Sequence, residues 1–144
     1  MKSVILFAAT LLLGTSVWAA DITPSTLVGR YNIEAKALNK SAKFRLVVID
    51  AKQFEIQRLY DDHAGKICNG TYQLKEESNW GEGGFGTNKI FKGLFSCPDD
   101  RSKTADFDIN FKTFTTRDLE KGAYVEVTSS LASGMTLNAK MKKE

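Results

Sequence analysis

Apolar and polar residues alternate one by one along several stretches of this chain. The clearest run is residues 106–112 (DFDINFK), where Phe107, Ile109 and Phe111 are separated by charged and amide side chains. Successive side chains of a β-strand point to opposite faces, so this alternation predicts a strand with one apolar face. Residues 135–142 (MTLNAKMK) repeat the pattern. Their apolar positions are Met135, Leu137, Ala139 and Met141.

Six further segments have the length and composition of strands, and short polar turns separate most of them. They are residues 27–36, 43–50, 53–60, 66–75, 89–97 and 124–131. Residues 43–50 (KFRLVVID) are apolar on both faces in the middle, which predicts a strand that is covered on both sides. Residues 115–122 are a connector with room for one helical turn.

Eight strands joined by short turns predict an all-β domain built as an antiparallel meander. An open meander exposes two sheet edges, and pairing the first strand with the last removes both edges by closing a barrel. We therefore expect a single-domain, eight-stranded β-barrel. A two-sheet β-sandwich is the alternative.

The strands at residues 66–75 and 89–97 fit together in one register. If Cys68 faces Cys97 in an antiparallel pair, the numbers of any two opposed residues add up to 165. The other opposed pairs are then Gly70–Phe95, Tyr72–Gly93 and Leu74–Phe91. All eight side chains point to one apolar face, and two of the pairs set an aromatic ring across from a glycine.

The first nineteen residues predict a cleaved export signal. Lys2 supplies a positive charge, residues 4–13 an apolar core, and Val17-Trp18-Ala19 a small-residue cleavage site with no cysteine nearby for lipoprotein processing. We expect an exported protein, periplasmic or secreted, without stable insertion in a membrane. The expected parts are residues 1–19 as signal peptide, 20–26 as a short polar lead-in and 27–144 as the β-barrel domain.

Export also bears on the two cysteines. An even number of cysteines in an oxidising compartment favours a disulfide over a metal site, so Cys68 and Cys97 are predicted to be bonded. Closing a loop of about 30 residues stabilises the fold by roughly 3–4 kcal/mol if the disulfide acts by restricting the unfolded chain.

Charge and candidate chemistry narrow the function. Without Lys2 the formal net charge falls from +3 to +2, which argues against nucleic acid as a partner. Lys140 and Lys142 share one face of a strand, which predicts a solvated sheet face. The only histidine, His63, follows two aspartates in a turn where neighbouring side chains diverge, so we predict no metal and no other cofactor. No G-x-S-x-G motif occurs and a disulfide removes both thiolates, so we expect no enzymatic activity.

Residues 76–88 (EESNWGEGGFGTN) are the best candidate for a functional segment. Interpreted as a loop, these 13 residues are long for a hairpin connection, and long loops in compact domains are commonly functional. The segment holds four glycines and two large aromatic residues, Trp80 and Phe85. The two rings can cover a barrel mouth or insert into a pocket of a partner. Packing of both rings as a plug over the barrel end is the other interpretation.

Two short motifs resemble those of known β-barrels. Gly29-Arg30-Tyr31 resembles the G-x-W turn that opens lipocalin-type (calycin) barrels, with tyrosine in place of tryptophan. Gly70-Thr71-Tyr72 resembles a strand motif of avidin-like barrels. The strand count, the length and the export signal are similar to those of small bacterial calycin-like domains. Over residues 27–142 the resemblance implies a cup-shaped barrel that holds a small apolar molecule.

Two functions fit these patterns. The first is binding of a small apolar or amphipathic ligand inside the barrel, beneath residues 76–88, with Trp80, Phe85, Tyr72 and Phe95 as contact residues. The second is a protein-interaction module, an inhibitor or an envelope adaptor, that binds its partner through the same segment. Large inward side chains can fill an eight-stranded barrel, and a filled interior would favour the second function.

Overall fold

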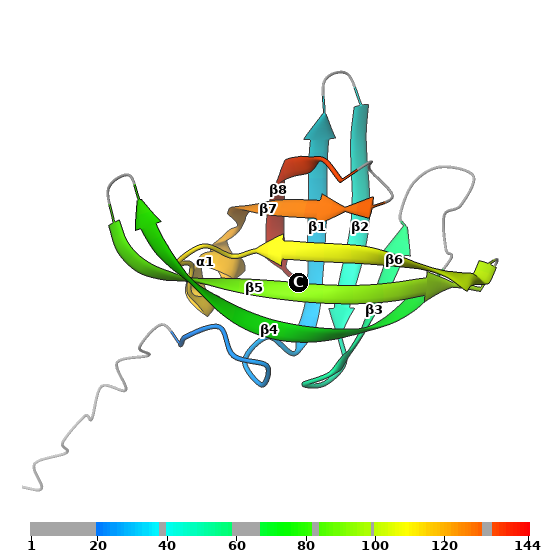
Figure 1. The fold of residues 1–144 in the computed structure, drawn as a ribbon, viewed down its shortest axis with the longest axis horizontal. Coiled ribbons are helices and arrows are strands. Elements are labelled where there is room, and N and C mark those ends of the chain that lie inside the picture. The colour runs from blue at the N-terminus through cyan, green and yellow to red at the C-terminus, as the bar shows by residue number, and fades with distance from the viewer. Residues whose placement is uncertain (1–19, 38–39, 59–66, 82–83, 99, 131–133) are drawn as a thin grey trace, which may run out of the picture.

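Eight antiparallel strands close into a barrel, as Figure 1 shows. The computed structural model describes residues 20–37, 40–58, 67–81, 84–98, 100–130 and 134–144. Each strand pairs with its neighbour in the sequence, and β1 pairs with β8. The strands are β1 (Gly29–Ala37), β2 (Lys40–Val48), β3 (Gln53–Arg58), β4 (Ile67–Gly81), β5 (Gly84–Cys97), β6 (Asp100–Asn110), β7 (Ala123–Ser129) and β8 (Thr136–Lys143). The predicted meander barrel is confirmed, and the sandwich alternative is wrong.

The predicted register of the central hairpin is also confirmed. Every opposed pair along β4 and β5, from Asn69–Ser96 to Gly81–Gly84, has numbers that add up to 165. Cys68 and Cys97 form a disulfide with their Cα atoms 4.2 Å apart, a spacing typical of a pair without direct backbone hydrogen bonds. The prediction of a loop over residues 76–88 is wrong, because both strands continue through it.

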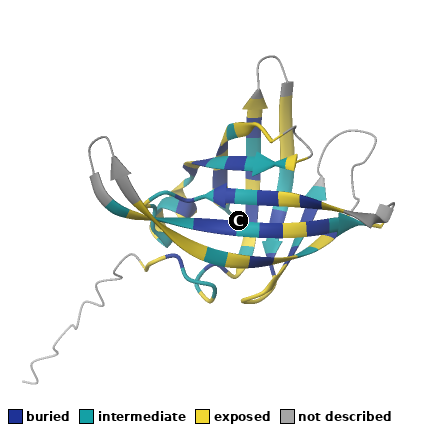
Figure 2. Ribbon diagram, viewed as in Figure 1, coloured by how far each residue is buried: buried dark blue, intermediate teal, exposed yellow. Residues whose placement is uncertain are grey.

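The apolar face of each strand lines the barrel interior, and Figure 2 shows buried and exposed residues alternating along the strands. Ile109, Phe111 and Phe107 are buried as predicted. Met135 is not, because it precedes the first residue of β8 and is 57% exposed. Likewise β2 is not covered on both sides. Leu46 and Val48 face inward and are buried, whereas Arg45 and Val47 on the other face of β2 are half-buried, because a barrel has only one interior.

Two short segments outside the strands complete the core. Ile22 of the predicted polar lead-in is fully buried, so that segment is a structural part of the barrel. Leu27 is also fully buried, but it precedes β1, which begins at Gly29 and not at residue 27 as predicted. The helix α1 (Thr116–Lys121) buries Leu119 and lies where one helical turn was predicted. The lead-in and α1 contact each other, since the Thr116 N–H donates to the Ala20 carbonyl at 3.0 Å.

The ring of Phe54 in β3 packs against two positions in the barrel wall where only glycine leaves enough space. Phe54 is opposite Gly70 of β4, and a Cβ atom on Gly70 would lie 2.6 Å from the Phe54 ring. A Cβ atom on Gly93 of β5 would lie 2.9 Å from the same ring. The sequence predicted the glycine–aromatic pairs within the hairpin, but the ring that covers both glycines comes from the next strand. Three adjacent strands are thereby packed closely together.

Candidate functional site

Aromatic rings fill the barrel interior. The ring centroids of Tyr72 and Phe91 are 4.4 Å apart in a stacked arrangement, and those of Phe54 and Phe91 are 5.1 Å apart edge to face. Phe107 contacts this group, with its ring centroid 6.3 Å from that of Phe54. Such pairs contribute beyond the apolar area that they bury. The interior is therefore a packed aromatic core.

Tyr72 and Phe95, two of the predicted contact residues, belong to this core. Tyr72 is 4% exposed, and its hydroxyl donates to the Asp50 carbonyl oxygen at 2.8 Å. Burial, and then the charge of Asp50, raise the pKa of the Tyr72 hydroxyl. Phe95 is 7% exposed, and its ring centroid is 6.3 Å from that of Phe107. Both residues hold the barrel together, and both are enclosed by other side chains.

The hairpin of β4 and β5 extends beyond the barrel (Figure 1). We call residues 76–81 and 84–88 the arm. The pairing of β4 with β3 ends at Thr71, and the pairing of β5 with β6 begins at Ile90. Two further backbone hydrogen bonds extend the contacts of β5 with the chain after β6 by one residue, to Lys89. The Lys89 N–H donates to the Lys112 carbonyl, and the Phe111 N–H donates to the Lys89 carbonyl. Within the described residues, each strand of the arm therefore pairs with a single strand, which is the other strand of the arm. The Thr113 side chain lies beside Gly86, so that a Cβ atom on Gly86 would be 2.9 Å from Thr113 Cγ2.

An ion pair supports the strand pairing at the base of the arm. The Glu76 carboxylate forms an ion pair with the Lys89 ammonium directly opposite. Trp80 and Phe85, the two predicted aromatic contact residues, are opposed near the end of the arm. Their backbones are placed in the strands, while their side chains lie outside the described part of the structure. The same sum of 165 that fixed the hairpin register also matches Glu76 to Lys89 and Trp80 to Phe85, which is the signal that could have predicted the arm.

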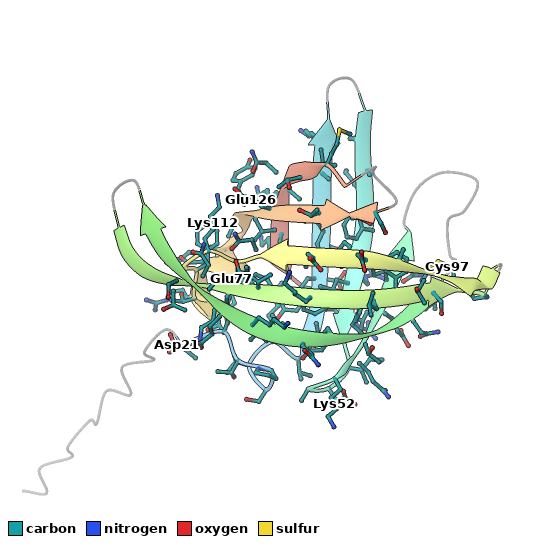
Figure 3. All side chains as sticks on the ribbon, in the orientation of Figure 1. Asp21, Lys52, Glu77, Cys97, Lys112 and Glu126 are labelled. Atoms are coloured by element: carbon teal, nitrogen blue, oxygen red, sulfur yellow. A yellow bond between two sulfur atoms is a disulfide. The ribbon has the colours of Figure 1, made fainter. Side chains whose placement is uncertain are left out.

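The disulfide lies at the opposite end of the hairpin from the arm. In Figure 3 the labels of Cys97 and Glu77 mark these two ends. The bond links residues 29 positions apart in the chain. It fixes the barrel end of a long hairpin whose other end projects outward.

A shallow hollow of about 390 Å³ lies over the outer faces of β2, β1 and β8. Its outward-facing lining residues are Asn32, Glu34, Lys43, Lys140 and Lys142. Lys140 and Lys142 are exposed, and the Glu34 carboxylate lies 3.8 Å from the Lys36 ammonium. This is the solvated sheet face that the sequence predicts for Lys140 and Lys142.

Several sequence features fall outside what the structure describes. The predicted signal peptide and His63 belong to the ranges that it leaves out. Within the described ranges, no three histidine, cysteine or acidic residues are grouped so that they could hold a metal ion. In the same ranges, no helix has the length and apolar character needed to cross a membrane.

The fold defines the protein as a small disulfide-bonded β-barrel with an arm. No family model, curated protein or solved structure matches the chain. The resemblance to lipocalin-type barrels stays a prediction.

Proposed function

We propose that this protein is an exported, non-enzymatic binding protein that engages a protein partner through the arm. The observation that carries this proposal is the arm itself, a two-stranded ribbon that extends past both neighbouring strands. A two-stranded ribbon is at best marginally stable in water without a third strand or a packed face. The opposed Trp80 and Phe85 near its end suit contact with another macromolecule, because aromatic residues dominate binding energy at protein interfaces.

The packing of the barrel favours a protein partner over an enclosed small ligand. A ligand inside the barrel would occupy the space that the rings of Phe54, Tyr72, Phe91 and Phe107 share. Displacing such rings leaves their partner rings without contacts, at a cost comparable to that of a large-to-small core substitution. Binding of a small apolar or amphipathic molecule stays a prediction, and the experiment below includes a measurement for it.

The arm can be shortened without disturbing the register. Asn79 and Gly86 are opposed, and the backbone groups of Asn79 point toward β5, so deletion of residues 80–85 and insertion of Asn-Gly between Asn79 and Gly86 leaves a hairpin with a favoured turn. A second variant replaces Trp80 and Phe85 with serine. The matched control is Tyr124→Ser, which removes an aromatic side chain that is 64% exposed on β7, a strand that pairs with neither strand of the arm.

The test is quantitative cross-linking and capture from the compartment in which the protein resides. We expect a partner that is enriched with the wild-type chain and with Tyr124→Ser, and lost with both arm variants. A partner set that both arm variants leave unchanged would contradict the proposal. Native mass spectrometry of the purified protein covers the alternative, since an extra mass that disappears on organic extraction would support a small ligand instead.

A further inference from the structure

Among the described residues, no strand pairs with one edge of β4 from residue 73 to the end of the strand. The Tyr72 N–H donates to the Lys52 carbonyl at 2.9 Å, which is the last backbone bond on that edge among the described residues. Lys52 lies in the turn between β2 and β3, and Figure 3 shows β4 continuing past it toward Glu77. The four residues 75–78 are all exposed. An open edge of this kind presents unpaired N–H and C=O groups to another strand.

The bond at Tyr72 shows which groups face the open edge. Consecutive residues of a strand direct their N–H and C=O groups to opposite sides. Because the Tyr72 N–H points toward β3, the backbone groups of Leu74, Glu76 and Ser78 point to the same, open side. These three residues can each form the hydrogen-bonded type of antiparallel pair with a new strand.

We propose that this edge pairs with the same edge of a second copy of the chain, about a two-fold axis at Glu76. The sheet would then run continuously from one barrel into the other. In this register Lys75 of each copy is opposite Glu77 of the other copy. These two residues belong to the closely spaced type of pair, in which side chains are nearest to each other. Neither residue forms an ion pair with another described residue, so both charges are available to a partner.

The charges select this register over its neighbours. An axis at Lys75 would oppose two lysines, and an axis at Glu77 would oppose two glutamates, and like charges directly opposed are destabilising. An axis at Glu76 opposes two copies of Glu76, but each of those carboxylates is already ion-paired with Lys89 of its own copy. Lys75 and Glu77 lie on either side of Glu76, whose charge is neutralised by Lys89. In an antiparallel pair of two such edges, each lysine faces a glutamate, and this charge complementarity identifies the partner as a second copy.

This inference is independent of the proposed function. It uses the edge of β4 at residues 74–78, whereas the proposed partner contact lies at the aromatic end of the arm. Charge substitutions at the edge leave Trp80 and Phe85 unchanged, so failure of one proposal does not imply failure of the other. Lys75 faces Ile90 and Glu77 faces Asn88 within the hairpin, so these substitutions also leave the internal ion pairs intact.

The test is analytical ultracentrifugation of the full exported chain over a range of protein concentrations. We expect a reversible dimer for the wild type. Lys75→Glu and Glu77→Lys each convert both charge pairs into like-charge pairs, and each should weaken the dimer by about tenfold or more. The double variant Lys75→Glu/Glu77→Lys restores two opposite-charge pairs and should recover an affinity within about threefold of the wild type.

A backbone variant tests the same edge independently of charge. Ser78→Pro removes an N–H that faces the open side, which proline tolerates on an edge strand, and it should give a folded monomer. A wild-type chain that stays monomeric at about 1 mM would overturn the proposal. A dimer that persists in Lys75→Glu, or a charge swap that fails to restore pairing, would also overturn it.

Discussion

Gly93→Ala tests the packing of three strands around Phe54. A Cβ atom at position 93 would lie 2.9 Å from three atoms, namely the Phe107 carbonyl oxygen, Phe54 Cζ and Phe91 Cε1. The carbonyl belongs to the β5–β6 ladder, where Gly93 is opposite Phe107, and cannot move independently. The two rings are fully buried and surrounded by other rings. A methyl group at this position therefore overpacks the core.

The expected size follows from two opposing contributions. Overpacking a close-packed core by one methyl group costs about 1–3 kcal/mol. Alanine also restricts the unfolded chain more than glycine does, and this effect stabilises the folded state by about 0.4–1 kcal/mol. We expect a net loss of about 1–2 kcal/mol in the free energy of unfolding, which for a domain of this size lowers Tm by about 3–10 °C. Gly70→Ala should cost more, because its Cβ atom would lie 2.4 Å from the Leu94 carbonyl oxygen.

The assay is urea unfolding followed by circular dichroism, with Gln73→Ala as the control. Gln73 is exposed on the outer face of β4, so its substitution should change the midpoint little. A double-mutant cycle with Phe54→Leu isolates the ring, since removing Phe54 Cζ should make Gly93→Ala less harmful by about 1 kcal/mol. The reasoning is refuted if Gly93→Ala matches the stability of the wild type, or if the cycle shows no coupling.

Two further predictions concern single contacts. Replacing both Cys68 and Cys97 with alanine should lower the free energy of unfolding by about 3–4 kcal/mol, and an unchanged urea midpoint would contradict this. Burial raises the pKa of the Tyr31 hydroxyl, which donates to the Leu27 carbonyl, to about 12 from 10.0. Because the pKa of Tyr31 is higher in the folded state than in the unfolded state, the protonated hydroxyl contributes to the free energy of unfolding. This contribution is complete below pH 10 and is lost as pH rises toward 12. Tyr31→Phe should flatten that loss, and urea midpoints that fall equally in both proteins above pH 10 would count against it.

The barrel was predictable because independent signals agreed on it. Along β4 and β5 the cysteine pair and the apolar alternation demand one register, and a shift by one residue would turn every inward side chain outward. The closing pair of β1 and β8 followed from the need to remove sheet edges. Neither inference required knowledge of side-chain contacts between distant strands.

Other parts of the core depend on contacts that a sequence pattern does not reveal. Ile22 stands in a short, mostly polar segment without periodicity, and only the assembled barrel shows that it is fully buried. In the same way, the ring over Gly70 and Gly93 comes from β3, so the pairs within the hairpin could indicate that a ring was needed but not which one supplies it.

The arm was misinterpreted as a loop because its composition and its pairing give different signals. Glycine is typical of loops because it frees the backbone. Residues 75–78 on the β4 side are all exposed, so the apolar alternation disappears there. β4 and β5 remain paired beyond the point where the apolar alternation ends. The opposed, ion-paired residues Glu76 and Lys89 are in the same register as the Cys68–Cys97 disulfide. A hairpin that continues beyond its neighbours loses the packing that stabilises a sheet. The stability of the barrel therefore does not account for the arm, which is the reason that we propose a contact with another molecule there.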